Sequence, residues 1–258
     1  MSQNEEEYDH ALVAMLELIW GEGFLSPGGP QAVREIVSGL DLEDKLVLDI
    51  GCGLGGLDII LASEFGARVI GLDVKIDLVR RAVEKIGKSG LSDRITLQHC
   101  EPGPLPQADN EIDIVFGKDS WIHVENKRAF FTEVFRVLKP GGILTAGDWM
   151  RSAKPYGKDM EYFFEMEGLT YHMETLEIYG DILHQCGFVN ISLDDVAEQY
   201  RAQSHQEYAN MKGPLKQQMA DSLGEEKQAY FIENWRAMTV VLDSGELRPA
   251  RFRAHKPL

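Results

Sequence analysis

The spacing of apolar and polar positions along the chain predicts strands and helices in alternation. Short apolar runs have the length of buried strands, and the segments between them carry apolar residues at helical spacing. The predicted strands are 45–50, 67–74, 94–100, 111–119 and 142–149, and the helices between them are 56–65, 76–90 and 126–142. Such alternation favours parallel strands with helices on both faces and right-handed crossovers. We therefore expect a doubly wound α/β sheet.

The alternation is less regular outside this central part. Two helices precede it, at 8–20 and at 30–40, where Pro30 suits a first helical turn. After Trp149 the pattern predicts helices at 157–168, 173–187, 198–222 and 225–240 and strands at 188–196 and 246–257. Pro249 lacks a backbone N–H, which makes the last strand an expected edge strand. We interpret residues 1–258 as one domain with an N-terminal helical lid (1–40) and a cap with substrate-binding insertions (150–240).

Composition narrows the range of functions. The three cysteines of the 258 residues show no CxxC spacing, which indicates a reduced compartment and no zinc or other metal site. No apolar run reaches the length that crosses a bilayer, and the acidic start "MSQNEEEYDH" differs from a signal peptide. A net charge of −16 disfavours nucleic acid as a partner. We expect a cytoplasmic protein with a small-molecule substrate and no membrane partner; the oligomeric state is not indicated.

The candidate chemistry starts at a glycine-rich turn. "DIGCGLGG" (49–56) joins a strand to a helix, and Asp73 ends the next strand, from where a carboxylate can accept both hydroxyls of a ribose. This arrangement serves two cofactor classes, the dinucleotides and S-adenosylmethionine (SAM). The glycine spacing departs from the dinucleotide pattern, and Asp49 would repel a pyrophosphate but attract a sulfonium and an amino group. Charge therefore favours SAM, with a nicotinamide dehydrogenase as the remote alternative.

"VLDIGCGLGG" resembles the first motif of the class I SAM-dependent methyltransferases. The resemblance implies a Rossmann-like seven-stranded sheet whose last strand is inserted antiparallel. It also implies that Gly51 and Gly53 line the methionine moiety, that Asp73 binds the ribose and that Val74 packs on the adenine. At the adenine amino group the family usually has Asp where this chain has Glu101. By position the cofactor contacts are Asp49, Gly51, Gly53, Asp73, Val74, Glu101, Pro102 and Lys118.

A closer resemblance covers nearly the whole chain. "IWGEGFLSPGG", "GKDSWIHVENK" and "YGDILHQCGF" are similar to the phosphoethanolamine N-methyltransferases and to the glycine, sarcosine and dimethylglycine N-methyltransferases. In the phosphoethanolamine enzymes a Tyr and a His close over the site and assist deprotonation. The resemblance implies that Tyr8 and His123 take these catalytic roles and that Leu25 and Ser26 contact SAM.

This chemistry suits an amine acceptor. An alkylammonium has no lone pair and must lose a proton before it accepts a methyl group, and His titrates near neutrality. Asp119 is placed to hold the charged amine, and Trp149 and Trp121 offer aromatic faces to a methylammonium. Without the resemblance, His123 reads as a structural histidine and the tryptophans as core residues.

The basic residues expected to bind a substrate phosphate are missing from the sequence. The phosphoethanolamine enzymes use an Arg and a Lys, but the aligned positions here hold Leu169 or a neighbour and Met238, while Tyr171 keeps an aromatic position in the substrate site. We therefore predict an N-methyltransferase for a small amine without a phosphate, such as sarcosine or dimethylglycine. The alternatives are phosphoethanolamine itself, methylation of oxygen, carbon or sulfur in another metabolite, and a non-catalytic SAM-binding regulator.

Overall fold

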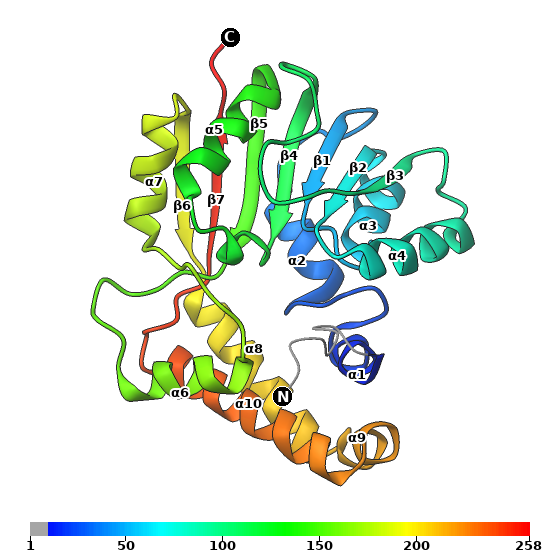
Figure 1. The fold of residues 1–258 in the computed structure, drawn as a ribbon, viewed down its shortest axis with the longest axis vertical. Coiled ribbons are helices and arrows are strands. Elements are labelled where there is room, and N and C mark those ends of the chain that lie inside the picture. Colours follow the sequence, from blue (N-terminus) through cyan, green and yellow to red (C-terminus); the bar gives the residue numbers. More distant parts are fainter. Residues whose placement is uncertain (1–9) are drawn as a thin grey trace.

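The computed structural model describes residues 10–258 and contains a seven-stranded sheet in the order β3-β2-β1-β4-β5-β7-β6 (Figure 1). The strands are β1 Leu46–Ile50, β2 Arg68–Asp73, β3 Ile95–His99, β4 Ile112–Lys118, β5 Leu138–Asp148, β6 Val189–Asp195 and β7 Ala250–His255. Strands β1 to β5 pair in parallel, and β7 lies antiparallel between β5 and β6. The predicted sheet with an inserted antiparallel last strand is confirmed.

The prediction of an edge strand at the end of the chain was wrong. β7 is internal, and β6 forms the edge beside it. Pro249 is compatible with this place because it precedes Ala250, the residue at which pairing with Asp148 of β5 begins. Its missing N–H therefore falls outside the ladder, where it removes no sheet hydrogen bond.

Helices cover both faces of the sheet (Figure 1). One face carries α2 (Gly29–Ile36), α3 (Gly56–Phe65) and α4 (Ile76–Ser89), whose apolar side chains pack with those of Val47 and Phe116. The other carries α5 (Lys127–Val137) and α7 (Leu176–Gln185), which pack with Leu48 and Val115. Helix α5 ends five residues earlier than predicted, because Pro140, Gly141 and Gly142 already belong to β5.

A second helical layer faces the carboxyl ends of the parallel strands (Figure 1). It consists of α1 (His10–Trp20), α6 (Lys158–Glu167), α8 (Ala197–Lys212), α9 (Lys216–Leu223) and α10 (Glu225–Asp243). These helices share a methionine-rich core of their own, formed in part by Met15, Met160, Met211, Met219 and Met238. Because α7 and β6 belong to the sheet layer, the cap between residues 150 and 240 is discontinuous in sequence.

Among residues 10–258, none of the helices combines the length and the apolar character needed to cross a membrane. The same residues contain no group of three or more His, Cys, Asp or Glu side chains arranged to hold a metal ion.

Candidate active site

Two residues, Ser120 and Leu25, lie so close to the glycine loop after β1 that it has no room for side chains. Gly51 and Gly53 have φ angles of +92° and +54°, which disfavour any residue with a side chain. A Cβ atom at Gly51 would lie 2.3 Å from Cβ of Ser120, and one at Gly53 would lie 3.3 Å from Cδ1 of Leu25. The loop thus requires glycine where the end of β4 and the segment before α2 come close.

Asp73 fixes this loop from the end of β2. Its Oδ2 accepts a hydrogen bond from the Gly53 N–H at 2.8 Å, and its Oδ1 accepts one from the Lys75 N–H, also at 2.8 Å. Burial raises the pKa of Asp73 above its usual range. The carboxylate keeps further lone pairs, so it can hold the loop and still accept from hydroxyl groups of a ligand.

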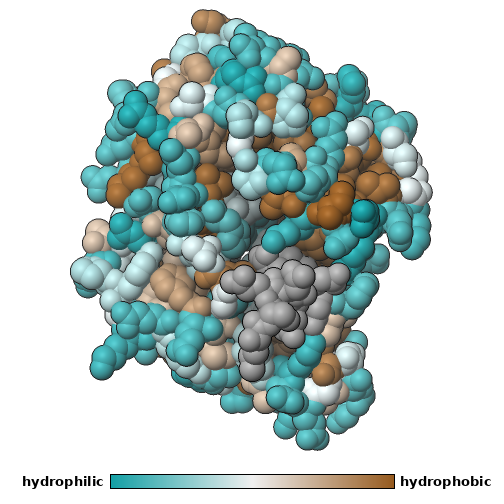
Figure 2. Space-filling model, in the orientation of Figure 1, coloured by the Kyte–Doolittle hydropathy of each residue, from teal (hydrophilic) through white to brown (hydrophobic). Residues whose placement is uncertain are grey.

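The predicted adenine contacts lie at the same edge of the sheet. Val74 is 46% exposed and belongs with Ile76 and Val83 to an apolar area at α4, which Figure 2 shows on that side of the molecule. Glu101 and Pro102 are exposed just beyond β3, the strand that pairs with β2. An exposed apolar area beside a buried carboxylate suits a flat ring attached to a sugar.

Asp49 lies beneath the loop rather than in the large cavity described below. Its carboxyl is fully buried next to that of Asp58, and the two side chains can hydrogen-bond to each other when one of them is protonated. Burial and the neighbouring Asp58 raise the pKa of Asp49 well above its usual range. Two adjacent buried carboxyls do not both ionise readily. Asp49 therefore does not line the large cavity, and its contact with SAM stays a prediction.

The end of β4 brings three predicted residues together. The Lys118 ammonium donates a 2.7 Å hydrogen bond to Oγ of Ser26 and forms an ion pair with Asp119. Asp119 has a φ of +55°, a conformation that is rare for a residue with a side chain and is concentrated at functional sites. Its Oδ1 is buried and has no hydrogen-bond partner among the described residues. Asp119 therefore offers an acceptor for a ligand.

These observations test whether the site suits SAM. The loop has no side chains at Gly51 and Gly53, and the Asp73 carboxylate lies at the end of the adjacent strand β2. Leu25 and Ser26 reach the same place from the segment before α2. SAM carries no phosphate, and the site offers acceptors and apolar surface rather than a cluster of basic residues. The residues fit the cofactor.

A cavity of about 700 Å³ lies between the sheet edge and the cap. Its lining includes Leu25, Ser26, Asp119, His123, Trp149 and Tyr171. The structure thus brings the predicted substrate residues to the predicted cofactor contacts. Tyr8 lies outside the described residues, and its role stays a prediction.

Trp121 does not contribute an aromatic face to the cavity, so that interpretation was wrong. Its ring is 2% exposed and packs against Phe130 and Phe131 in the sheet core. Its Nε1 donates a 3.0 Å hydrogen bond to the carbonyl of Ile50. It is a structural residue that joins the helical turn after β4 to the end of β1.

His123 ends that turn, a short 3₁₀ helix at Trp121–His123. Its Nδ1 lies 3.2 Å from the carbonyl oxygen of Thr170, and its ring centroid lies 5.4 Å from that of Tyr171. These contacts join His123 to the segment between α6 and α7. Because a carbonyl oxygen only accepts, Nδ1 is the donor in this hydrogen bond, which leaves Nε2 as the ring nitrogen that can take up a proton.

A buried carboxyl that the sequence analysis missed holds this turn. Asp148 ends β5, and its Oδ1 accepts from the Ile122 N–H at 3.2 Å while its Oδ2 accepts from the Tyr179 hydroxyl at 2.8 Å. Burial raises the pKa of Asp148 to about 7. Its position at the carboxyl end of a strand, like that of Asp73, was a signal in the sequence that could have identified it.

Glu207 is a second residue that sequence reasoning missed, because it lies within a helix of mixed polarity. Its carboxylate accepts from Nε1 of Trp20 at 2.7 Å and from Nε1 of Trp235 at 3.0 Å, and both rings line the large cavity.

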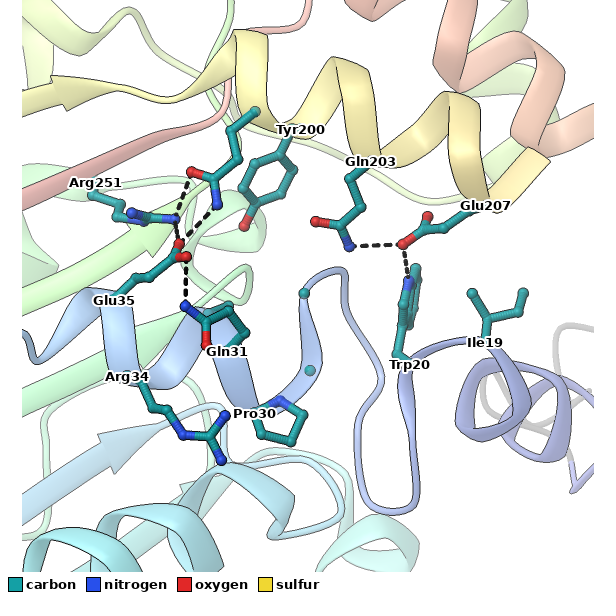
Figure 3. A pocket seen from close by; sticks show the side chains of 14 residues that line it. Ile19, Trp20, Pro30, Gln31, Arg34, Glu35, Tyr200, Gln203, Glu207 and Arg251 are labelled. Atoms are coloured by element: carbon teal, nitrogen blue, oxygen red, sulfur yellow. Dashed lines mark hydrogen bonds and ion pairs between the residues drawn. The ribbon is translucent and has the colours of Figure 1, made fainter. Parts of the chain in front are cut away.

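A second cavity of about 430 Å³ lies between α2 and α8 beside Trp20 (Figure 3). Its polar side chains largely bind one another, with Glu35 accepting from Gln31 and Gln199. These hydrogen bonds join α2 of the sheet layer to α8 of the cap.

The chain is similar in sequence to known methyltransferases. A model of a methyltransferase domain matches residues 47–142. A phosphoethanolamine N-methyltransferase of Plasmodium falciparum is 31% identical over 195 residues, which cover 74% of this chain and 72% of that relative. One from Triticum aestivum is 29% identical over 95% of this chain, but the match covers only 48% of its own length. The chain thus spans about half the length of the plant relatives it matches.

Solved structures agree on the fold. Phosphoethanolamine N-methyltransferase 2 of Haemonchus contortus superposes with a TM-score of 0.92 at 23% identity, over 99% of this chain and 60% of that one. A Galdieria sulphuraria protein, proposed to be a sarcosine dimethylglycine methyltransferase, gives a TM-score of 0.81 at 20% identity over 95% of this chain and 96% of its own.

The sheet, the glycine loop and these matches define a class I SAM-dependent methyltransferase, an enzyme whose cofactor is SAM. Within that class, the chain belongs to the phosphoethanolamine N-methyltransferase family.

Proposed function

We propose that this protein transfers the methyl group of SAM to the nitrogen of a small amine. The proposal rests on one observation: a single cavity is lined by His123, Asp119, Leu25 and Ser26. A base and an acceptor for a charged amine thus lie beside residues expected to contact the cofactor. Transfer to nitrogen requires both, since the amine arrives with a proton that it must lose.

The side chains divide this task. Asp119 accepts a hydrogen bond from the ammonium and orients it, and His123 removes a proton so that the nitrogen regains its lone pair. Trp149 and Tyr171 flank the cavity and exclude water while favouring a cation. Bound SAM supplies a methyl group on positively charged sulfur, which is the electrophile for that lone pair.

The names of the relatives support phosphoethanolamine as the acceptor better than the amine without a phosphate that the sequence pattern suggested. Several plant and parasite relatives carry this name, and the Haemonchus contortus enzyme was solved with phosphomonomethylethanolamine and S-adenosylhomocysteine.

One observation favours an acceptor without a phosphate as the second candidate. Leu169 and Met238, the residues at the aligned positions of the missing Arg and Lys, both line the cavity. Among the described lining residues, Lys227 is the single lysine or arginine. Phosphate recognition usually relies on several charge-assisted hydrogen bonds, often from arginine.

A methyl-transfer assay with the purified protein and SAM tests the proposal. The acceptor panel contains phosphoethanolamine, ethanolamine, glycine, sarcosine and dimethylglycine, and mass spectrometry identifies the methylated atom. Methylation of nitrogen in at least one of them is the expected result. Methyl transfer only to hydroxyl, carbon or sulfur acceptors in a parallel panel would contradict it.

A further inference from the structure

A buried lysine lies beside the turn that carries His123. Lys127 begins α5, yet it is only 3% exposed. Formation of the helix does not explain a cation at this position, because the positive end of the helix dipole disfavours it and burial of a charge costs free energy. Burial lowers the pKa of Lys127, while the nearby Asp148 carboxyl opposes that shift. A buried ammonium at such a place indicates that its hydrogen bonds stabilise another part of the structure.

The Lys127 ammonium donates three hydrogen bonds, all of them to backbone carbonyl oxygens. Two of the acceptors, Trp121 at 2.8 Å and Val124, lie on either side of His123 in the chain. The third acceptor is His172, at 2.9 Å, in the segment between α6 and α7. A lysine has three donors, so these carbonyls use all of them. Lys127 thus joins the turn of the proposed base to the segment that contacts this base.

The same two segments are also joined by the bonds that orient the His123 ring. The His172 N–H donates a 2.8 Å hydrogen bond to the carbonyl of Ile122, so the turn and Lys127 hold both sides of His172. Two residues earlier, the Thr170 carbonyl accepts from Nδ1 of His123. This bond favours the tautomer with Nδ1 protonated and leaves Nε2 to take up the proton of the amine. A shift of the segment would therefore release the ring of the base.

The position of a general base decides how well it works. It must lie within hydrogen-bond reach of the proton that it removes, and a displacement of about 1 Å can lower a rate about 10²-fold. We propose that Lys127 is a positioning residue for His123, because it holds the turn at Trp121–His123 against residues 170–172 and thereby fixes the ring and the tautomer of the base. Lys127 is not among the residues that line the large cavity, so it acts through His123. This role rests on the proposed N-methyltransferase function and adds a residue outside the cavity to it.

Nuclear magnetic resonance of the His123 ring tests this role without relying on catalysis. The histidines are isotope-labelled, and the signal of His123 is the one that His123→Ala removes. At a pH where the ring is neutral, we expect one tautomer with Nδ1 protonated in the wild type and exchanging tautomers in Lys127→Met, because methionine donates no hydrogen bond. Arg128→Met removes an exposed cation from the same helix and should keep the wild-type tautomer.

A double-mutant cycle measures the effect on methyl transfer. Lys127→Met should lower kcat about tenfold and leave the KM for SAM unchanged. In the His123→Ala background the same substitution should change the residual turnover by less than about twofold, because a residue that acts through His123 has no effect without it. Lys127→Arg keeps the charge and several donors and should restore most of kcat. Calorimetry with S-adenosylhomocysteine counts the folded sites, so a loss of folded protein is not scored as a loss of kcat.

Four outcomes would overturn the inference. They are a mixture of tautomers in the wild type, a fixed tautomer that persists in Lys127→Met, an unchanged kcat in this variant, and an equal fall of kcat with and without His123. The first is measured on the wild type and does not depend on the folding of a variant. A protein that methylates no amine, but whose His123 tautomer is fixed in the wild type and released in Lys127→Met, would contradict the proposed function and leave the role of Lys127 standing.

Discussion

The indole Nε1 of Trp20 donates a 2.7 Å hydrogen bond to Oε1 of Glu207, across 187 positions of the sequence. The bond joins the last residue of α1 to the middle of α8, and the same carboxylate accepts from Trp235 of α10. Three helices of the cap layer are thus fixed to one another at the wall of the large cavity. Figure 3 shows Trp20 and Glu207 pointing toward each other across the gap between their elements.

Replacing Glu207 by Gln should therefore weaken acceptor binding more than cofactor binding. Glutamine offers one acceptor oxygen instead of two, so one indole N–H loses its partner at a cost of about 1 kcal/mol or more. We expect the KM for the amine to rise about fivefold with the KM for SAM unchanged. Steady-state kinetics measure both, with Glu198→Gln on the exposed side of α8 as the control. An unchanged amine KM would show that this bond does not shape the cavity.

Replacing His123 by Ala should reduce turnover and leave the cofactor site intact. General base catalysis contributes about 10²–10⁴-fold, and His123 is the described residue placed to provide it. The kcat for the amine is expected to fall by that order, while calorimetry should give the wild-type affinity for S-adenosylhomocysteine. His184→Ala, an exposed histidine on α7, serves as the control. Persistence of wild-type turnover would assign the proton transfer to another group.

Replacing Asp73 by Ala should act on the cofactor. The substitution removes the carboxylate that accepts from the Gly53 and Lys75 N–H groups, and hydrogen bonds to charged groups contribute about 1.5–3 kcal/mol each. The Kd for SAM should rise at least about tenfold, and hydrogen exchange of the Gly53 amide should become faster. Asp77→Ala in the first turn of α4 is exposed and should change neither quantity. Unchanged exchange at Gly53 would contradict the anchoring role.

Asp58 should make folding stability depend on pH. Burial raises its pKa from 3.8 to about 7, so between these values the folded state binds more protons than the unfolded chain. Stability from the protonated carboxyl is complete below pH 4 and is lost as the pH rises to 7.

The variant Asp58→Asn lacks this titration. Urea denaturation of the cofactor-free protein at pH 5 and pH 8 should show that the wild type loses about 3 kcal/mol more than the variant over this interval. Asp181→Asn, an exposed aspartate of α7, should follow the wild type. Parallel curves for wild type and Asp58→Asn would show that Asp58 is ionised in the folded protein throughout the interval.

The strand–loop–helix–strand unit around the glycine loop, which local sequence determines, was predicted correctly, and the ligand contacts of its residues stay predictions. Gly51, Gly53 and Asp73 lie within a single strand–loop–helix–strand unit, so the positions of the glycines and of the acidic residue follow from chain connectivity. The same unit places Asp73 at the edge where the loop lies. Placing these residues within one unit needs no knowledge of distant contacts.

Long-range packing decided which of the other candidate side chains reach the cavity, and local sequence does not predict such packing. Trp121 and Trp149 both follow a strand that ends near the site, yet the first is buried in the sheet core and the second lines the cavity. Asp49, next to the glycines in sequence, points beneath the loop to Asp58.

The sequence by itself determined the alternation of strands and helices, the cofactor loop and the reaction class, because periodicity and motif spacing are properties of neighbouring residues. The tertiary structure alone decided that Trp121 lies in the core while Trp149 lines the cavity, that Asp148 holds the turn at Trp121–His123, and that Glu207 joins two tryptophans. Each of these depends on which distant surfaces pack together, and that choice follows from burying the apolar surface of the whole chain at once.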